Sequence, residues 1–220
     1  MSEKLGATLK ELQSKGLNLG VVYDIGARHG DWTREIRQIL TGSEFILFDA
    51  NEKCSSYLAR SGFKFFIGVL SSEVKVVDFY DNDSTGDSYY KENTVFYDSV
   101  KSVKRTTTTL DLLVSKNDVP LPNFIKLDTQ GSELDILYGA IAVLKHASLA
   151  YLECPILNYN AGAPVFQDYI HFLNDHGFVP YDICELHYAH GVLIQMDVLF
   201  ISKMKLLKIY PSSARILHCI

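Results

Sequence analysis

The chain has 220 residues, 47% of them hydrophobic, and a formal net charge of −5 at pH 7. A chain of this size can bury one substantial core and does not require a second domain. The acidic balance excludes a broad basic surface for a nucleic-acid backbone, so we expect no nucleic-acid partner, although Lys101, Lys104 and Arg105 form a short basic patch.

The sequence predicts neither a targeting segment nor a membrane anchor. Its first residues lack the apolar core of a signal peptide, and no apolar run approaches the roughly 20 residues of a spanning helix. We therefore expect a soluble cytoplasmic protein. The cysteines include no C-x-x-C pair, so they predict neither a zinc ribbon nor a disulfide framework; they are Cys54, Cys154, Cys184 and Cys219.

The first part of the chain alternates between helices and strands. Residues 1–18 are predicted to contain a polar N-terminal helix that Gly16 ends. The first buried strand leads into a glycine-rich turn and a helix with one apolar face, and the next strand, helix and strand repeat the pattern. The predicted strands are Val21–Asp24, Phe45–Asp49 and Phe63–Ile67, and the predicted helices run from residue 3 to 16, from Asp31 to near Gly42, and from Glu52 to Arg60.

The rhythm changes between about residues 69 and 110, where the sequence predicts a β-rich insert. Val74–Tyr80 and Thr106–Thr109 have the composition of strands, and a polar loop runs from Asp81 to Glu92. A loop of this length is long enough to be a lid or a substrate loop.

Alternation resumes after the insert. One helix is predicted to present four aliphatic side chains on a single face, and another to begin with Pro164 at its first position. The last two strands are close enough in sequence to form an antiparallel hairpin. Residues 206–220 are predicted to be a C-terminal extension. The aliphatic face comprises Leu134, Leu137, Ile141 and Leu144, and the strands are Phe124–Asp128, Leu149–Glu153, Phe178–Ile183 and Val192–Ile201.

Together these elements predict one doubly wound α/β domain over residues 19–205. Strands that alternate with helices of this length imply right-handed crossovers and a parallel sheet with helices on both faces. The prediction is a mostly parallel, seven-stranded sheet whose last strand is antiparallel.

Four of the predicted strands end in an acidic residue. Ligands of open α/β sheets bind outside the carboxyl ends of the strands. A carboxylate at the edge of a core must be hydrated, paired or used. We therefore treat these side chains as candidates for a binding site: Asp24, Asp49, Asp128 and Glu153.

The turn after the first strand differs from a dinucleotide-binding turn, in which G-x-G-x-x-G holds a pyrophosphate. It has only Gly26 and Gly30, with Asp24 before them and Arg28 between. A carboxylate here repels a diphosphate and suits the ammonium of a methionine moiety, while the glycines let a ligand approach the backbone. By itself the turn fits several cofactors, because any βα turn can carry two glycines.

Asp49 narrows the choice among these cofactors. It lies 25 positions after Asp24 at the end of the second strand, where an acid accepts hydrogen bonds from the ribose hydroxyls of an adenosine ligand. The alternative is that Asp49 only caps the turn at Asn51. The two acids together favour a nucleoside ligand that carries no phosphate.

The sequence resembles the FkbM-type methyltransferases over roughly residues 20 to 203. The resemblance implies a class I fold, S-adenosylmethionine as the cofactor, and methyl transfer to oxygen, often to a hydroxyl of a sugar or natural product. Arg28 and Phe48–Asn51 depart from the family pattern, which commonly has a small or amide residue and a Glu-Pro pair at these places. The stretches that carry the resemblance are Tyr23–Gly30, Thr109–Leu113, Ile125–Glu133, Leu137–Ala140, Gly177–Phe178 and Asp197–Ile201.

Roles follow from the chemistry that this resemblance implies. An alcohol must lose a proton when it accepts a methyl group, and we predict that Glu153 is the general base and that Asp128 positions cofactor or acceptor. The alternatives are that Asp128 caps the following helix and that Glu153 is a buried, hydrogen-bonded carboxylate. The predicted cofactor-binding residues are Asp24, Gly26, Ala27, Arg28, Gly30, Asp49, Ala50 and Asp128.

The acceptor site is predicted from polar and aromatic side chains near the same edge of the sheet. The loop from Asp83 to Tyr90 offers small hydroxyls and tyrosines that suit a polar acceptor such as a sugar, although a plain surface loop has the same composition. The predicted acceptor-binding residues are Ser88, Tyr89, Tyr159 and His187.

Histidines give weaker indications. His187 and His190, with Glu185 and Asp197 nearby in sequence, allow a metal site or a base, but histidines on a predicted loop are usually solvated. We therefore assign no metal site. His29, within the first turn, either contacts a ligand or caps the next helix.

The leading hypothesis is an S-adenosylmethionine-dependent O-methyltransferase whose acceptor is a small molecule or a glycan. A second hypothesis is a noncatalytic module that keeps the fold to bind a nucleoside or a partner, since fold alone does not establish activity. A nicotinamide dehydrogenase is disfavoured because two of the Rossmann glycines are missing. The sequence does not predict an oligomeric state.

Overall fold

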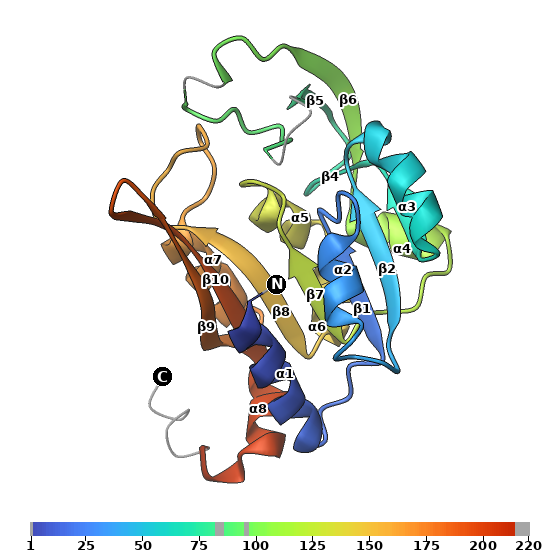
Figure 1. Ribbon diagram of the computed structural model, residues 1–220, viewed down its shortest axis with the longest axis vertical. Coiled ribbons are helices and arrows are strands. Elements are labelled where there is room, and N and C mark those ends of the chain that lie inside the picture. The colour runs from blue at the N-terminus through green and yellow to red at the C-terminus, as the bar shows by residue number, and fades with distance from the viewer. Residues whose placement is uncertain (1, 82–85, 95–96, 214–220) are drawn as a thin grey trace.

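The computed structural model describes residues 2–81, 86–94 and 97–213. At its centre is a seven-stranded sheet with the order β3-β2-β1-β7-β8-β10-β9 (Figure 1). Every neighbouring pair is parallel except the two that involve β10. The predicted sheet, mostly parallel with an antiparallel last strand, is therefore confirmed. The strands are β1 (Val21–Ile25), β2 (Glu44–Asp49), β3 (Lys64–Ile67), β7 (Phe124–Leu127), β8 (Leu149–Pro155), β9 (Phe178–Ala189) and β10 (Val192–Ser202).

Helices cover both faces of this sheet, as predicted. Alternate side chains of β1 belong to two separate buried clusters: Tyr23 and Ile25 lie in one, and Val22 lies in the other. The first cluster includes side chains of α4 (Leu110–Lys116), α5 (Glu133–Tyr138), α6 (Ile141–His146) and α7 (Phe166–Asp175), and the second includes side chains of α1 (Glu3–Ser14), α2 (Asp31–Ile36), α3 (Ser55–Ser61) and α8 (Lys203–Ile209). Single 3₁₀ turns at Glu52–Cys54 and Pro211–Ser213 precede α3 and follow α8.

The N-terminal helix is amphipathic rather than simply polar. Leu5, Leu9 and Leu12 recur at helical spacing, and all three are fully buried against the sheet. Thr8 also donates a hydrogen bond of 2.9 Å to Asp182 of β9. The helix α1 therefore contributes to the core of the domain.

The predicted helix through Leu134 and Leu144 is two helices. The helix is interrupted at Gly139 and Ala140, which lie between α5 and α6. At Gly139 a Cβ atom would lie 2.2 Å from the carbonyl oxygen of Ser71, so the backbone at the break packs directly against the insert. The helical periodicity continues across the break, which is why the sequence pattern did not reveal it.

Helix boundaries also differ from the predictions elsewhere. The helix predicted to start at Pro164 begins at Phe166, because Val165 is its N-cap and donates a backbone hydrogen bond to Asp168 at 2.9 Å. Helix α4 was not predicted; the Thr109 hydroxyl caps it by accepting a hydrogen bond from the Leu112 N–H at 3.1 Å. Helix α2 ends at Ile36, short of Gly42, and turns follow it.

The hairpin of β9 and β10 is longer than predicted. Strand β9 continues past Ile183 to Ala189, and Leu193 pairs with Tyr188 near its end. The expectation that His187 lies in a loop is therefore wrong. Cross-strand hydrogen bonds with β10 override the polar composition of this segment.

A small second sheet of three strands occupies the region where the sequence predicted a β-rich insert. Its order is β4-β6-β5, and the strands are β4 (Val69–Leu70), β5 (Val76–Tyr80) and β6 (Ser102–Thr108). In Figure 1 this sheet lies beyond one end of the main sheet. Since β4 follows β3 with only Gly68 between them, the insert starts from the carboxyl edge.

The chain reverses its direction of winding at β1. From β1 it proceeds outward through β2 to β3, and on the other side through β7 to β8. The crevice between the carboxyl ends of β1 and β7 is where a doubly wound sheet binds its ligand. The helices and the insert leave this crevice open.

Candidate active site

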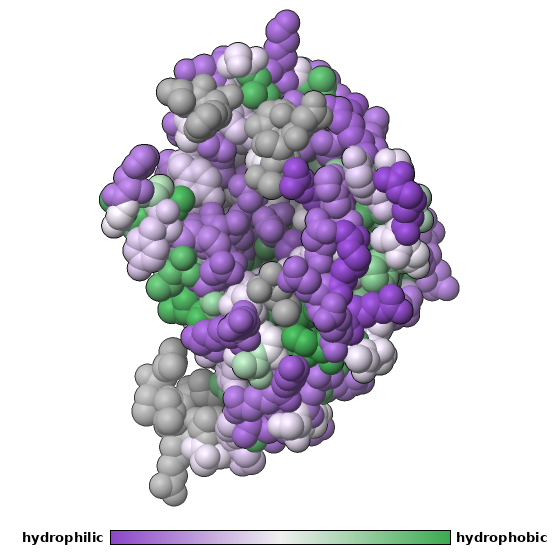
Figure 2. All heavy atoms as spheres, viewed as in Figure 1, coloured by the Kyte–Doolittle hydropathy of each residue, from purple (hydrophilic) through white to green (hydrophobic). Residues whose placement is uncertain are grey.

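A cavity of ≈400 Å³ lies at the carboxyl ends of β1, β2 and β7. The face of the molecule in Figure 2 is hollowed near its centre and is mainly hydrophilic around the hollow. Helix α5 and the insert complete the cavity. Its lining includes Gly26, Arg28, Phe48, Asp49, Ala50, Cys54, Phe79, Asp87, Ser88, Tyr89, Asp128, Gln130, Ser132, Ile136 and Glu153.

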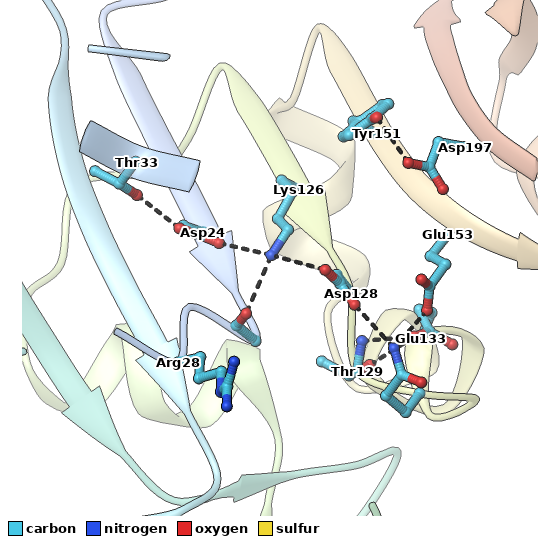
Figure 3. A network of polar contacts seen from close by, with 12 residues as sticks. Asp24, Arg28, Thr33, Lys126, Asp128, Thr129, Glu133, Tyr151, Glu153 and Asp197 are labelled. Carbon is cyan, nitrogen blue, oxygen red and sulfur yellow. Dashed lines mark hydrogen bonds and ion pairs between the residues drawn. The ribbon is translucent and has the colours of Figure 1, made fainter. Parts of the chain in front are cut away.

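Asp24 lies beneath this cavity and does not line it. Its side chain is 0% exposed and forms an ion pair of 2.9 Å with the ammonium of Lys126. The Thr33 hydroxyl donates a hydrogen bond of 2.6 Å to the other oxygen of Asp24 (Figure 3). The sequence suggested that Asp24 faces the ligand, whereas in the structure its carboxylate is paired with the buried ammonium of Lys126.

Lys126 is a residue of this candidate site that the sequence analysis missed. Its ammonium also donates to the carbonyl oxygen of Gly26 at 3.1 Å and lies 3.5 Å from Asp128 (Figure 3). Burial alone lowers the pKa of Lys126, but the charges of Asp24 and Asp128 outweigh it, and the pKa is raised. A lysine within the apolar strand Phe124–Leu127 was the signal, because a charge in such a strand must be paired.

The glycine turn has its two glycines for different reasons. Gly26 has φ +78, and a Cβ there would lie 1.8 Å from the carbonyl oxygen of Asp128, so it lets the first turn approach the end of β7. Gly30 has φ +77 and packs against Leu47, away from the cavity. Ala27 is 5% exposed and belongs to the buried core. Of the residues predicted in this turn, Gly26 and Arg28 line the cavity.

Asp49 joins the ends of β1 and β2. One carboxylate oxygen accepts from the Arg28 N–H at 2.6 Å and the other from the Asn51 N–H at 2.8 Å. The turn at Asn51 is therefore capped as the alternative interpretation expected. Each carboxylate oxygen has a second acceptor position, so the cap does not exclude a ligand in the cavity, which Asp49 and Ala50 both line. Burial raises the pKa of Asp49, and the two backbone N–H groups offset part of this.

Asp128, after β7, and Glu153, on the neighbouring strand β8, both line the cavity and lie on either side of one side-chain amide (Figure 3). The side-chain amide of Gln130 donates 3.1 Å to Asp128 and 2.7 Å to Glu153. The amide of Gln195 donates to the other oxygen of Glu153. Asp128 does not cap α5, whose N-cap is Ser132.

The pKa of Glu153 is raised well above the usual 4.5. Burial is the main cause, and the negative charges of Asp128, Glu133 and Asp197 add to it. The Glu153 carboxyl is hydrogen-bonded, as the alternative to a catalytic role expected. It also lines the cavity. A carboxyl with a raised pKa at a cavity wall is suited to take up a proton.

Glu133 organises the loop between Asp128 and α5. It is 0% exposed and accepts hydrogen bonds from the Thr129 N–H at 2.7 Å, the Gly131 N–H at 3.0 Å and the Tyr169 hydroxyl at 2.7 Å. The sequence analysis assigned Glu133 no role of its own. Its structural role is to fix the loop that carries Gln130.

The polar loop of the insert closes one side of the cavity. Ser88 is 2% exposed and lines the cavity with Tyr89. The hydroxyls of Tyr89 and Tyr90 both donate to Asp135 of α5, at 3.0 and 2.9 Å. The predicted loop residues Asp83–Thr85 lie outside the described residues.

The other predicted acceptor residues lie apart from this cavity's lining. The Tyr159 hydroxyl donates to Gln195, and His187 lies 3.1 Å from Asp197. Asp197 also lines a smaller cavity of ≈170 Å³ that shares Asp128 and Glu153 with the larger one. Ligand atoms of Glu185, His187 and Asp197 lie within 4.8 Å of one another, the spacing of a group that could hold a metal ion.

The remaining candidates have structural partners. The ring of His29 stacks on that of Tyr57, with centroids 4.0 Å apart. Cys54, Cys154 and Cys184 are free and buried, and Cys219 lies outside the described residues. Within the described ranges, no helix is long and apolar enough to cross a membrane.

Fold and cavity define the class of protein: a doubly wound α/β protein with a nucleoside-sized cavity at its switch point. The chain matches the Methyltransferase FkbM domain over residues 24–180, and it belongs to that family. It is an S-adenosylmethionine-dependent methyltransferase built on a mostly parallel, seven-stranded sheet.

Similar solved structures come from several bacterial methyltransferases. They include magnesium protoporphyrin IX methyltransferase from Synechocystis PCC 6803 with bound SAM (12% identity, TM-score 0.49, 90% of this chain and 78% of that chain). Precorrin-6y C5,15-methyltransferase from Geobacter metallireducens GS-15 is similar at 14% identity, TM-score 0.47, over 91% and 88% of the two chains. A TehB-like SAM-dependent methyltransferase from Corynebacterium glutamicum is similar at 12% identity, TM-score 0.44, over 88% and 86%. None of the curated proteins compared with the chain matches it.

Proposed function

We propose that the enzyme methylates a hydroxyl oxygen of a carbohydrate or natural product. The observation that carries this proposal is the carboxyl of Glu153, which lies on the wall of the cavity beside Asp128 and has a raised pKa. An alcohol is a poor nucleophile until a base takes its proton, whereas the methyl acceptor of many other transfers needs no such base. A carboxyl with a raised pKa is the base that the described lining offers.

The cavity fits the cofactor in its charge. Its described lining has four carboxylates, from Asp49, Asp87, Asp128 and Glu153, against one cationic side chain, Arg28. Such a lining repels a diphosphate and attracts the sulfonium and ammonium cations of S-adenosylmethionine. The same charge argument disfavours a dinucleotide cofactor.

Asp49 would hold the ribose hydroxyls, and Ala50 and Phe48 would pack against the base. Gly26 and Arg28 would lie along the methionine moiety, while Asp24 acts from beneath by holding Lys126 in place. The cofactor supplies a methyl group bonded to a positively charged sulfur.

Glu153 would accept the proton of the acceptor hydroxyl as that oxygen takes the methyl group and the carbon–sulfur bond breaks, with its electron pair left on a neutral sulfur. Asp128 and Gln130 keep the Glu153 carboxylate facing the cavity. The insert, through Ser88 and Tyr89, forms one wall of the larger cavity. The acceptor would enter on the side of the smaller cavity, which shares Asp128 and Glu153.

The test is methyl transfer from methyl-labelled S-adenosylmethionine to a panel of sugars and hydroxylated natural products, with amines and carboxylic acids as the comparison set. We expect the label in an ether, located by mass spectrometry. Glu153→Gln should abolish turnover and leave the affinity for the neutral product, S-adenosylhomocysteine, within a few-fold of the wild type. Label found only on nitrogen or carboxylate would overturn the assignment to hydroxyls.

A further inference from the structure

Gln130 joins the two carboxylates on which the proposed reaction depends. Its side-chain nitrogen lies 3.1 Å from an oxygen of Asp128 and 2.7 Å from an oxygen of Glu153. A primary amide carries two hydrogens, so one is available to each carboxylate. Among the residues that the structure describes, no other side chain donates to both acids.

The backbone at Gln130 has an unusual conformation. Its φ is +55°, in the left-handed region that residues other than glycine rarely adopt. The surroundings hold it there: its carbonyl oxygen accepts from the Asn160 side chain at 3.2 Å, and the next N–H, of Gly131, donates to Glu133 at 3.0 Å. Strained residues that are over-determined in this way cluster at functional sites.

A second amide completes the arrangement around Glu153. Gln195 donates a hydrogen bond to the oxygen of Glu153 that Gln130 does not contact. The Tyr159 hydroxyl orients Gln195 by donating a hydrogen bond to its side-chain oxygen. Each oxygen of Glu153 therefore has one neutral donor. Because a carboxylate oxygen accepts about two hydrogen bonds, each oxygen of Glu153 can also accept one from the hydroxyl of the methyl acceptor.

We propose that Gln130 is a positioning residue that, with Gln195, keeps the Glu153 carboxylate ionised and directed toward the transferring methyl group. This inference rests on the proposed function. The amide donors are neutral, so they stabilise the anion of Glu153 without placing a competing cation beside the sulfonium.

The electrostatic surroundings of Glu153 make such donors necessary. Burial and neighbouring acids raise its pKa, and the hydrogen bond from Gln195 lowers it. A donor from Gln130 acts in the same direction as that from Gln195. In the part of the chain that the structure describes, the titratable groups that interact with Glu153 include Lys126 and Asp128 at β7, Glu133 of α5, Asp197 of β10, Tyr159 after β8, Tyr169 of α7 and Cys154 of β8 itself.

The cofactor and its product provide a test that needs no acceptor. S-adenosylmethionine carries a sulfonium cation, and S-adenosylhomocysteine is neutral at that sulfur. If the sulfur lies beside Glu153, the enzyme prefers the cation only where Glu153 is ionised. The ratio of the two Kd values, measured by calorimetry across the pH range in which the protein stays folded, therefore has a midpoint that reports the ionisation of Glu153.

In Gln130→Met, which has a similar length and no donor, we expect this midpoint to rise by about one pH unit, the effect of losing one hydrogen bond to a charged group. Gln195→Met should move it in the same direction. Gln130→Gly also lacks the amide but relieves the backbone, so it should shift the midpoint without loss of thermal stability. Asp118→Gly is the matched control, because Asp118 shares the left-handed conformation, with φ 47, and does not contact these acids.

A midpoint unchanged in both Gln130 variants would show a merely structural role and overturn the inference. A wild-type ratio that does not vary with pH would overturn it as well. If the wild type binds neither ligand, the proposed function itself fails, which is a different result from binding with an unmoved midpoint.

Discussion

Lys126 and Asp24 form an ion pair, 2.9 Å from Nζ to Oδ1, in which the side chains are only 5% and 0% exposed. The pair links the central strands β1 and β7, whose residues at these positions are direct neighbours in the sheet. It also connects the interior to the cavity, because the same ammonium lies 3.5 Å from Asp128. The charge at the cavity floor thus depends on a pair whose acid, Asp24, lies outside the described lining of both cavities.

Removing one partner of this pair should destabilise the protein strongly. We expect Lys126→Met to lower the free energy of unfolding by about 3–5 kcal/mol, because it leaves the buried carboxylate of Asp24 uncompensated. Urea unfolding followed by circular dichroism measures this change. The double variant Lys126→Met with Asp24→Asn should recover a large part of the loss. A single variant as stable as the wild type would contradict a stabilising role for this ion pair.

The buried acids predict a particular pH dependence. Burial is the main cause that raises the pKa of both Glu133 and Glu153 above 4.5. A carboxyl with a higher pKa in the folded chain than in the unfolded chain binds more protons when folded between the two values. The free energy of unfolding therefore falls as the pH rises from about 4.5 through the folded pKa.

We accordingly expect Glu153→Gln, which cannot titrate, to lose less thermal stability than the wild type as the pH rises from about 4.5 to neutral. Differential scanning calorimetry at a series of pH values gives the slope for each protein. Glu73→Gln, at an acid whose side chain is 70% exposed, is the control and should follow the wild-type slope. Equal slopes in Glu153→Gln and the wild type would contradict the raised pKa.

Cofactor binding should depend on Asp49. We expect Asp49→Ala to weaken the affinity for S-adenosylmethionine by about tenfold to 150-fold, the range for hydrogen bonds to a charged group. Calorimetric titration measures it. Asp182→Asn is the matched control, since Asp182 contacts Thr8 and Lys4 of α1 and lies outside the described cavity lining. An unchanged affinity in Asp49→Ala would place the ribose elsewhere.

The insert should loosen when its contacts with α5 are removed. Asp135→Ala deletes the acceptor for both Tyr89 and Tyr90, each bond worth about 1 kcal/mol. We expect amide hydrogen exchange in residues 86–94 to become about tenfold faster or more. Asp168→Ala, which removes a cap from α7, should leave that segment unchanged. Exchange at the wild-type rate in Asp135→Ala would mean that other contacts hold the loop.

Periodicity and spacing were sufficient to predict the sheet and the edge at which the site lies. The seven strands are separated by turns with clear glycine signals, and Asp49, Asp128 and Glu153 follow from the rule that parallel strands end at one edge. The helix break at Gly139 was not predictable in this way. It depends on a close contact with Ser71, which is distant in sequence.

Pairing within the site was also hidden from the sequence. A pattern places Asp24 at the end of a strand, but only the register of β1 against β7 brings Lys126 beside it. Gln130 gave no signal either, because neither its left-handed backbone nor its reach to Glu153 follows from local composition. Such contacts between segments far apart in the chain decide the electrostatics of the site.

Gly26 of the first turn and Gly62, the C-cap of α3, form a matched pair for separating backbone strain from steric contact. Gly26 and Gly62 have nearly the same backbone, with φ +78 and +77. A Cβ at Gly62 meets nothing within 4 Å, whereas at Gly26 it would lie 1.8 Å from the carbonyl oxygen of Asp128. We expect Gly62→Ala to cost about 1–2 kcal/mol, the strain of the left-handed conformation alone.

Gly26→Ala carries the same strain and must in addition push the first turn away from the end of β7. We expect a larger loss of stability than in Gly62→Ala, and a loss of affinity for S-adenosylmethionine that Gly62→Ala does not share. Thermal unfolding and calorimetric titration of both variants measure the two effects. Equal losses in the two variants would mean that the contact with Asp128 relaxes freely and does not fix the geometry of the cavity.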